Sequence, residues 1–360
     1  MQGEAMTDID RRAARRLRRI VALLVAATVV SLAQIPQSAS AGRSYTKADF
    51  DAFAQQMLAQ GDACVYVSQG GKVVGEWYAS TQPATKQHSV MSFTKSLAST
   101  LVGIAQDKKL LKVSDKVSKY VTAWNTPQSK DITIAQVLSM TTGRSDNGYG
   151  FAIGNRKYAN EQTQLAPPGT EWRYNSSAVQ VLEEVLATAT KMPVSKFAED
   201  NLLKPLGIKT NLIADASGAT GMFIGWQATC KEAAALVNLY LEKGKVNGRQ
   251  IVSSSWVTSA LTSSSTLNAG YGYLWWLNNS GSVMNIGERP RTGRLMQTWP
   301  TDAFWMQGVC HQFAVGVLSS KLVVVRLRPN CWGAQAIAAE QANWTPTKTF
   351  IELLGKILKT

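Results

Sequence analysis

Two residues three positions apart could carry out nucleophilic chemistry in this chain. They are Ser92 and Lys95, in the stretch of residues 91–96, MSFTKS. Side chains three apart on a helix lie on the same face and within reach of each other. A lysine amine placed there can take the proton of the serine hydroxyl, which makes Ser92 a candidate nucleophile. Burial and the positive end of the helix dipole both lower the pKa of such a lysine toward neutrality.

The same spacing occurs at Ser44 and Lys47, where it predicts only the start of a surface helix. Residues 46–58 have apolar side chains at helical spacing, and Asp49 falls in the first turn, as is typical of a helix N-terminus. Position separates the two motifs. Ser92 follows a predicted β-hairpin and opens a helix whose small and apolar residues are typical of one packed on all sides.

A serine nucleophile needs a proton acceptor, and the two histidines of the chain, His88 and His311, give little support for a Ser-His-Asp triad. No G-x-S-x-G motif is present, and we assign His88 to the surface. Lys95 is therefore the expected base. A second hydrogen-bonding group is expected to pass the proton to the leaving group. Tyr174 is the candidate, although packing beside the neighbouring tryptophan explains its spacing equally well.

These residues resemble the motifs of the serine β-lactamase and penicillin-binding superfamily. The S-x-x-K of Ser92 and Lys95 is followed about eighty residues later by Pro-Gly-Thr-x-x-x-Tyr174-Asn175-Ser176. A Tyr-x-Asn or Tyr-x-Ser motif is similar to that of the class C-like branch. Within this branch the likeness spans most of residues 60–330. The phrases that resemble aminohexanoate-dimer (nylon oligomer) hydrolases are 91–102, 136–138, 173–182 and Trp275-Trp276.

The resemblance implies an acyl-enzyme mechanism with Ser92 as the acylated nucleophile and Lys95 and Tyr174 as acid/base partners. It also implies an oxyanion hole formed by the backbone N–H of Ser92 and one from the strand 305–311, which we place at Gln307. Pre-aimed donors of this kind can contribute about 3 kcal/mol each. The residues that we place around the substrate pocket are Tyr149, Ser176 and His311.

The Lys-Thr-Gly motif of the superfamily is missing. The strand beside the serine ends in His311-Gln312, where relatives without Lys-Thr-Gly often have Gly-Gln. The lysine and threonine that hold the carboxylate of a β-lactam or a peptide are therefore absent, which disfavours penicillin and D-Ala-D-Ala substrates. His311 adds bulk and a titratable group. Pocket lining, strand packing and an additional proton donor all remain open for it.

The order of predicted elements indicates an α+β protein, and the resemblance implies a β-lactamase/transpeptidase-like fold. We expect an antiparallel sheet flanked by helices, with an all-helical inserted domain. Residues 42–110 and 245–360 would form a split α/β domain, and 111–244 a mostly helical domain that carries the Tyr174 motif. The strands and last helix expected in the C-terminal part are 271–276, 305–318, 322–327 and 346–358.

Residues 1–41 have the pattern of a secretory signal peptide. Six arginines between positions 11 and 19 precede fourteen mostly apolar residues, and small residues lead to Ala39-Ser40-Ala41. Fourteen residues are fewer than the ~18 of a membrane span. We expect cleavage after Ala41 and a periplasmic or secreted protein without a stable membrane span. The alternative is an uncleaved membrane anchor.

The net charge of the chain limits the classes of molecule that it is expected to bind. The net charge of +14 becomes +11 when residues 1–41 are removed with their six arginines and three acids. The basic residues are scattered and no nucleic-acid motif accompanies them, so the charge indicates solubility and surface adhesion.

An oxidising compartment favours disulfides. Cys310 and Cys331 flank a predicted hairpin and would lie opposite each other, whereas Cys64 and Cys230 have no such argument. Neither a metal site nor a cofactor is expected.

The leading interpretation is an exported serine hydrolase that cleaves amide or ester bonds of small substrates. Its acyl-enzyme would form on Ser92, with a Lys/Tyr acid-base pair. The alternatives are a β-lactamase or D-Ala-D-Ala carboxypeptidase, a carboxylesterase of the same fold, and a binding or sensor module that does not turn over. Retention of Ser92, Lys95 and Tyr174 together argues against an inactive relic. The oligomeric state does not follow from the sequence.

Overall fold

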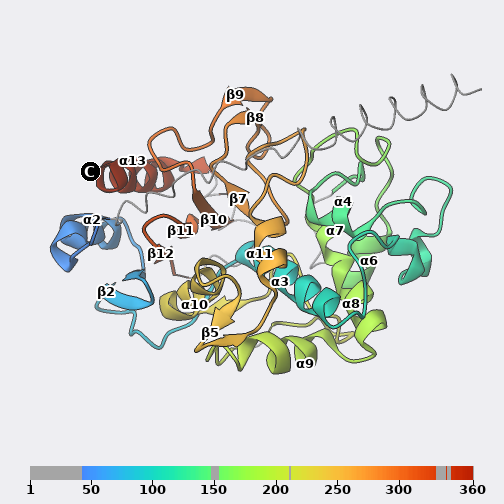
Figure 1. Cartoon of the computed structure of the whole chain (residues 1–360), viewed down its shortest axis with the longest axis horizontal. Coiled ribbons are helices and arrows are strands. Elements are labelled where there is room, and N and C mark those ends of the chain that lie inside the picture. The colour runs from blue at the N-terminus through green and yellow to red at the C-terminus, as the bar shows by residue number, and fades with distance from the viewer. Residues whose placement is uncertain (1–42, 147–153, 211, 330–337, 339–341, 360) are drawn as a thin grey trace, which may run out of the picture. The chain divides into compact units, whose positions relative to one another are not determined.

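The computed structural model describes residues 43–146, 154–210, 212–329, 338 and 342–359. Its largest sheet has six antiparallel strands in the order β2-β1-β12-β11-β10-β7 (Figure 1). Because β1 pairs with β12, the hairpin near the start of the chain completes a sheet built from its end. The strands are β1 Cys64–Gln69, β2 Lys72–Tyr78, β7 Trp276–Leu277, β10 Ala303–Gly308, β11 Gln312–Val317 and β12 Leu322–Leu327.

Helices cover both faces of this sheet. Helices α2 (Lys47–Ala59) and α13 (Thr345–Lys359) contact each other, and α10 (Cys230–Leu241) contacts β1, β11 and β12 (Figure 1). Successive side chains of a strand point to opposite faces. On β11 the ring of Phe313 lies 5.1 Å from that of Phe350 in α13, whereas a Cβ on Gly316 would meet Val237 of α10 at 2.8 Å. Helices α13 and α10 therefore lie on opposite faces.

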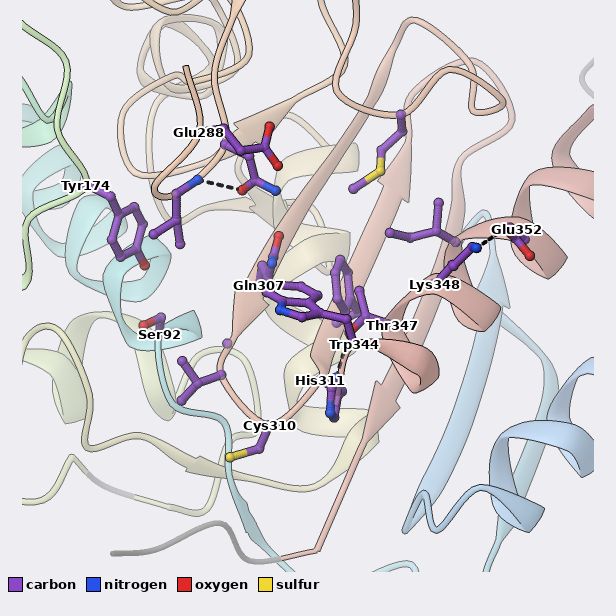
Figure 2. A pocket seen from close by; sticks show the side chains of 17 residues that line it. Ser92, Tyr174, Glu288, Gln307, Cys310, His311, Trp344, Thr347, Lys348 and Glu352 are labelled. Atoms are coloured by element: carbon purple, nitrogen blue, oxygen red, sulfur yellow. Dashed lines mark hydrogen bonds and ion pairs between the residues drawn. The ribbon is translucent and has the colours of Figure 1, made fainter. Parts of the chain in front are cut away.

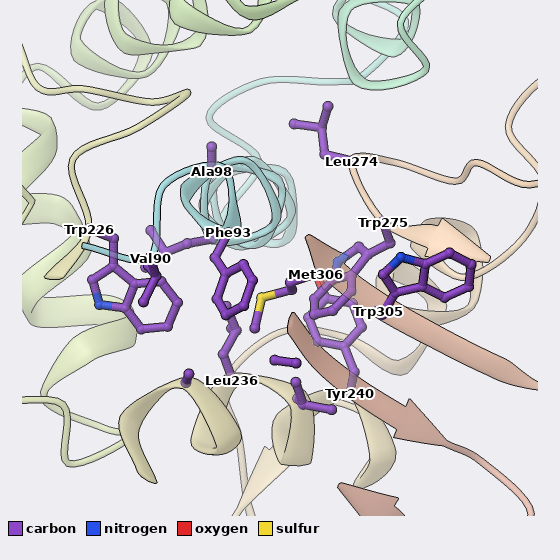
Figure 3. Close-up of a cluster of buried hydrophobic side chains, with 14 of the residues drawn as sticks. Val90, Phe93, Ala98, Trp226, Leu236, Tyr240, Leu274, Trp275, Trp305 and Met306 are labelled. Atoms are coloured by element: carbon purple, nitrogen blue, oxygen red, sulfur yellow. The ribbon is translucent and has the colours of Figure 1, made fainter. Parts of the chain in front are cut away.

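Helix α3 (Phe93–Asp107) begins directly after the candidate nucleophile and is enclosed by the protein: every residue from Phe93 to Ala105 is buried. Figure 3 shows it beside aromatic side chains that come from α10 and from the strands. The Thr100 hydroxyl lies 2.9 Å from that of Tyr240, and a Cβ on Gly103 would be 2.5 Å from the indole of Trp256. The small residues of α3 therefore serve close packing, as predicted.

The segment between α3 and α10 is a series of short helices with little sheet. Helix α8 packs against α3, which joins this part to the nucleophile helix. Helix α10 packs on the sheet, although the sequence placed it with the helical domain, and the two-domain division stays a prediction. The helices here are η1 Val117–Lys119, η2 Thr122–Trp124, α4 Ile134–Leu138, α6 Asn155–Asn160, α7 Ser176–Gln180, α8 Leu182–Thr190, α9 Val194–Ala198 and η3 Glu199–Leu203.

The remaining elements are short. Strand β3 pairs with β4, β5 with β6 and β8 with β9, in each case antiparallel. Their bounds, with those of α11, are β3 His88–Ser89, β4 Gln227–Ala228, β5 Lys245–Val246, β6 Arg249–Gln250, α11 Ser254–Ala260, β8 Gly281–Val283 and β9 Arg291–Gly293.

Two strand predictions are wrong. The run 305–318 is two strands, β10 and β11, joined by a turn in which Cys310 and His311 have φ values of 64° and 61°. Left-handed backbone is usually marked by glycine or asparagine, so a turn built on cysteine and histidine leaves no signal in the sequence. The run 271–276 is mostly irregular, because Leu274 has a φ of 60° and only its last residue enters β7.

Other expectations are confirmed or corrected by single contacts. The first S-x-x-K does begin a helix: Lys47 pairs with Asp51, and the two side chains are 57% and 47% exposed. His88, expected at the surface, is only 1% exposed, because it pairs in β3 with β4. Burial lowers the pKa of His88 to about 4, so its ring is neutral near pH 7.

Two cysteines without a predicted partner are joined: Cys64 at the start of β1 forms a disulfide with Cys230 at the start of α10. Cys310 is also disulfide-bonded. Its predicted partner, Cys331, lies outside the described residues, as does the predicted signal peptide 1–41. Within the described part of the chain, no helix is both long and apolar enough to cross a membrane.

Candidate active site

Ser92 lies at the N-terminus of α3, directly after a strained residue. Met91 has a φ of 51°, in the left-handed region that is unfavourable for a non-glycine side chain. Backbone N–H groups of Phe93 and Thr94 donate to the carbonyls of Val90 and Met91, which fixes the sharp entry into the helix. The turn leaves the Ser92 side chain half-buried at the edge of a cavity.

Lys95 reaches back along the same helix face to Ser92. Its Nζ donates to Ser92 Oγ at 2.9 Å and to the carbonyl oxygen of Phe223 at 3.2 Å. Lys95 is 1% exposed. Burial disfavours an ammonium ion and lowers the pKa of Lys95 to about 7, while the charge of Asp146 acts in the opposite direction. A large fraction of Lys95 is therefore a neutral amine near pH 7, able to accept a proton.

Tyr174 completes the group that the sequence singled out. Its ring centre lies 4.8 Å from Lys95 Nζ, and its hydroxyl hydrogen-bonds the Ser92 side chain. Burial raises the pKa of Tyr174 far above its ordinary value of 10, and the hydrogen bond with Ser92 only partly offsets this rise. The tyrosine is thus a neutral hydroxyl that can both donate and accept.

The segment after Tyr174 is fastened to the chain at residues 144–146. The Asn175 amide donates to the carbonyls of Arg144 and Ser145 at 2.7 and 3.0 Å, and its Oδ1 accepts from Ala178 N as the cap of α7. Asp146 accepts from the Ser176 N–H at 2.5 Å and from the hydroxyl of Tyr158. These bonds explain why Asn175 and Ser176 accompany the tyrosine in the motif.

Aromatic rings form the wall behind Tyr174. The Trp276 indole stacks on the Tyr174 ring at 5.9 Å, and Tyr271 meets the same ring edge-on at 6.4 Å. On its other side Trp276 lies 6.3 Å from Trp305 of β10, again nearly parallel. These contacts fix the orientation of the tyrosine. Tyr271 and Trp305 were not predicted as site residues, because an aromatic side chain in a predicted strand is usually explained by core packing.

The end of β10 passes close to the nucleophile. A Cβ on Gly308 would be 2.6 Å from the carbonyl oxygen of Val90, so only glycine allows this approach without a shift. The preceding residue, Gln307, lines the same cavity as Ser92, and its side chain accepts from the Trp305 indole at 3.3 Å. Within the described residues, no hydrogen bond is formed by the Ser92 backbone N–H.

A cavity of about 590 Å³ extends from Ser92 and Tyr174 toward α13. Figure 2 shows Ser92 and Tyr174 together on one side, Gln307 between, and Trp344, Thr347 and Lys348 on the other. The lining is mainly apolar. Apolar residues of the lining are Ile286, Met296, Val309, Phe313, Trp344 and Ile351. Its charged members, Glu288, Lys348 and Glu352, lie away from Ser92 in the same view.

The other predicted pocket residues have different positions. His311 does line the cavity, and its Nδ1 lies 2.7 Å from the Thr347 hydroxyl of α13. Ser176 is not among the described residues that line it, because it starts α7 and its N–H is directed to Asp146. Tyr149 lies outside the described residues. Within those residues no group of three or more His, Cys, Asp or Glu side chains could hold a metal ion.

Asp146 is the functional candidate that sequence reasoning missed. It is the acid whose charge acts on both Lys95 and Tyr174. It stood in a polar, glycine-containing stretch, 139–150, where a carboxylate is common at the surface. Only its bonds to Ser176 and Tyr158 place it beside the site.

The chain is similar to known proteins over most of its length. The family model described as Beta-lactamase matches residues 50–328. A protein provisionally assigned as a 6-aminohexanoate-dimer hydrolase from Bacillus anthracis superposes with a TM-score of 0.66 and 16% identity, over 84% of this chain and 82% of its own. The octameric penicillin-binding protein homologue from Pyrococcus abyssi gives 0.63 and 15%, over 86% and 77%. A family VIII carboxylesterase gives 0.61 and 15%, over 88% and 99%.

Proposed function

This chain belongs to the β-lactamase family and has its β-lactamase/transpeptidase-like fold, and on that basis we propose that it is an exported serine hydrolase acting on small amides or esters through an acyl-enzyme. The proposal is carried by one observation. Lys95 Nζ lies 2.9 Å from Ser92 Oγ while burial holds the pKa of the lysine at about 7. A neutral amine in contact with a hydroxyl is a general base in place.

In the acylation step Ser92 Oγ attacks the substrate carbonyl carbon, and the hydroxyl proton passes to the lone pair of Lys95. The carbonyl π electrons move to its oxygen, which gives a tetrahedral oxyanion. Tyr174 then donates its proton to the leaving nitrogen or oxygen and regains one from the Lys95 ammonium as the bond breaks. Deacylation follows the same path with water as the nucleophile. Water attacks the carbonyl carbon of the Ser92 ester and gives up a proton to the base; the bond to Ser92 Oγ then breaks, Oγ regains a proton, and the acid is released.

The oxyanion formed in this step needs donors that are already aimed at it. We assign them to the backbone N–H groups of Ser92 and Gln307. The close approach of Gly308 to Val90 supports the pairing, because it brings the end of β10 beside the start of α3. Each such donor is worth about 3 kcal/mol of barrier lowering.

The cavity favours an uncharged, largely apolar substrate. The Lys-Thr-Gly motif is missing, and Lys348, the only lysine among the described lining residues, lies 4.0 Å from the carboxylate of Glu352. No strong carboxylate site is therefore formed near the nucleophile by the described residues. Burial of an apolar substrate chain contributes about 0.8 kcal/mol of favourable free energy per CH₂ group. Short to medium acyl esters and linear amides fit this lining better than a β-lactam carboxylate.

The test uses the mature protein with a fluorophosphonate, a p-nitrophenyl ester series, a linear amide dimer and a chromogenic cephalosporin. We expect a covalent adduct on Ser92 and faster turnover of the ester and amide than of the cephalosporin. Ser92→Ala and Lys95→Met should abolish turnover, whereas Ser44→Ala and Lys47→Met, the same changes in the second S-x-x-K, should leave it intact. Turnover that survives Ser92→Ala would remove the assignment.

Export is the second part of the proposal and rests on the composition of residues 1–41. The full-length gene would be expressed in a bacterial host, and the mass of the protein recovered from the periplasm or medium would be measured. A chain that begins at Gly42 is expected. Recovery of the uncut chain in the membrane fraction would instead support an anchor.

A further inference from the structure

Asp146 lies next to the catalytic group without lining the described cavity. One carboxylate oxygen accepts from the Ser176 N–H at 2.5 Å, two residues after Tyr174, and the other accepts from the hydroxyl of Tyr158 in α6. Its carboxylate is thus fixed in position by two donors from different segments.

The reaction step creates a charge that the site must accommodate. When Lys95 accepts the proton of Ser92, an ammonium ion forms at a side chain that is only 1% exposed. A buried charge without compensation costs several kcal/mol. The groups in contact with Lys95 are the Ser92 hydroxyl, the Phe223 carbonyl and the rings of Tyr174 and Phe223, and the charge of the Asp146 carboxylate also acts on it. Of these described groups, the carboxylate is the one with a full negative charge.

We propose that Asp146 is a positioning residue for the reaction, serving as the counter-ion of Lys95 during acylation and as the anchor of the segment that carries Tyr174. The inference rests on the proposed function, because it assigns a partner to the same base. It adds an acid to the nucleophile, base and tyrosine of the proposed mechanism. The balance of the step is unchanged: the proton moves from Ser92 to Lys95, and Asp146 takes no part in the transfer.

The two roles can be separated by an isosteric change. Asn at position 146 keeps an oxygen for the Ser176 N–H and an amide that can meet the Tyr158 hydroxyl, but it has no charge. In Asp146→Asn we therefore expect kcat for an ester to fall at least tenfold with KM within a factor of about three. The Asp146 charge raises the pKa of Lys95, so its loss moves the acid limb of kcat/KM to lower pH. The ratio of kcat/KM at pH 6 to that at pH 9 should rise.

Asp215 provides the matched control. Its carboxylate also holds a neighbouring turn in place, since it accepts from the N–H groups of Asn155, Ser217 and Ala219. Unlike Asp146, it does not shift the pKa of Lys95. Asp215→Asn should lower stability without changing the pH dependence of turnover. Asp146→Glu keeps the charge and serves as a rescue variant if the asparagine variant folds poorly.

Two results would overturn the proposal. One is an Asp146→Asn enzyme with wild-type kcat and an unmoved acid limb. The other is a loss of kcat that appears equally in Asp146→Glu and follows the fall in thermal stability, which indicates an anchor alone. Failure of the proposed function looks different, because Ser92→Ala would then retain turnover whatever the behaviour of position 146.

Discussion

The Gly308 Cα lies so close to Val90 that an added Cβ would be 2.6 Å from the Val90 carbonyl oxygen. Because the obstructing atom belongs to the backbone, an alanine here must push β10 away from the turn that presents Ser92. We expect Gly308→Ala to lower kcat/KM for an ester at least tenfold, measured by steady-state kinetics.

Gly316→Ala is the control for this prediction. Its Cβ would be as crowded, at 2.5 Å from the ring of Phe304, but it lies against α10 and away from the nucleophile. That variant should lose stability without a selective loss of kcat/KM. If the two changes lowered activity equally, the result would contradict the assignment of the end of β10 to the oxyanion hole.

The buried lysine should make the fold less stable than it could be. The folded-state pKa of Lys95 is about 7, below its ordinary value of 10.5, so the unfolded chain binds more protons between these limits. Stability from this group is therefore lowest below pH 7 and is regained as the pH rises toward 10.5. Lys95→Met should raise the melting temperature at pH 6 by several degrees and less at pH 9, while abolishing turnover. Calorimetry at the two pH values checks this, and a lower melting temperature at pH 6 would contradict it.

The hydrogen bond between His311 and Thr347 joins the β10–β11 turn to α13. It helps to hold His311 in a left-handed conformation that costs about 1–2 kcal/mol in a non-glycine residue. Thr347→Val should lower the free energy of unfolding by about 1 kcal/mol. In a His311→Gly background the same change should have little effect. A double-mutant cycle by denaturant unfolding measures the coupling, and additive changes would show that the bond contributes nothing.

The contact between Gly103 and Trp256 leaves no room for a methyl group. Alanine normally favours a helix over glycine by about 1 kcal/mol. Here the Cβ would be 2.5 Å from a buried indole, and overpacking costs about 1–3 kcal/mol. We expect Gly103→Ala to be destabilising in urea unfolding. In a Trp256→Phe background the penalty should shrink or change sign, and an unchanged penalty would contradict the steric explanation.

The sequence predicted the grouping of Ser92, Lys95 and Tyr174, which the structure places in contact, better than the space around it. Ser92 and Lys95 follow from helix geometry, and α2, α3 and α13 follow from their apolar spacing and end signals. Tyr174 needed the resemblance, because its distance from Ser92 is set by how α7 packs and not by any local pattern.

Features made by distant segments could not be predicted. The cavity joins residues near 92, 174, 286, 307 and 344–352, and no local rule relates such segments. The β10–β11 turn uses Cys310 and His311 where glycine or asparagine is usual, so a hairpin appeared as one strand. The disulfide between Cys64 and Cys230 spans 166 residues and depends on α10 packing against the sheet.

That disulfide closes a loop containing Ser92, Lys95, Asp146 and Tyr174. A cut by a protease in the stretch 161–165, where Glu161, Thr163 and Leu165 are exposed, would therefore leave the two pieces of the chain attached to each other. On a denaturing gel the nicked protein should run as one band without reductant and as two with it. The chain-entropy account assigns about 5 kcal/mol to closing a loop of this length. A chain held in this way stays in one piece when a surface loop inside the disulfide-closed segment is cut.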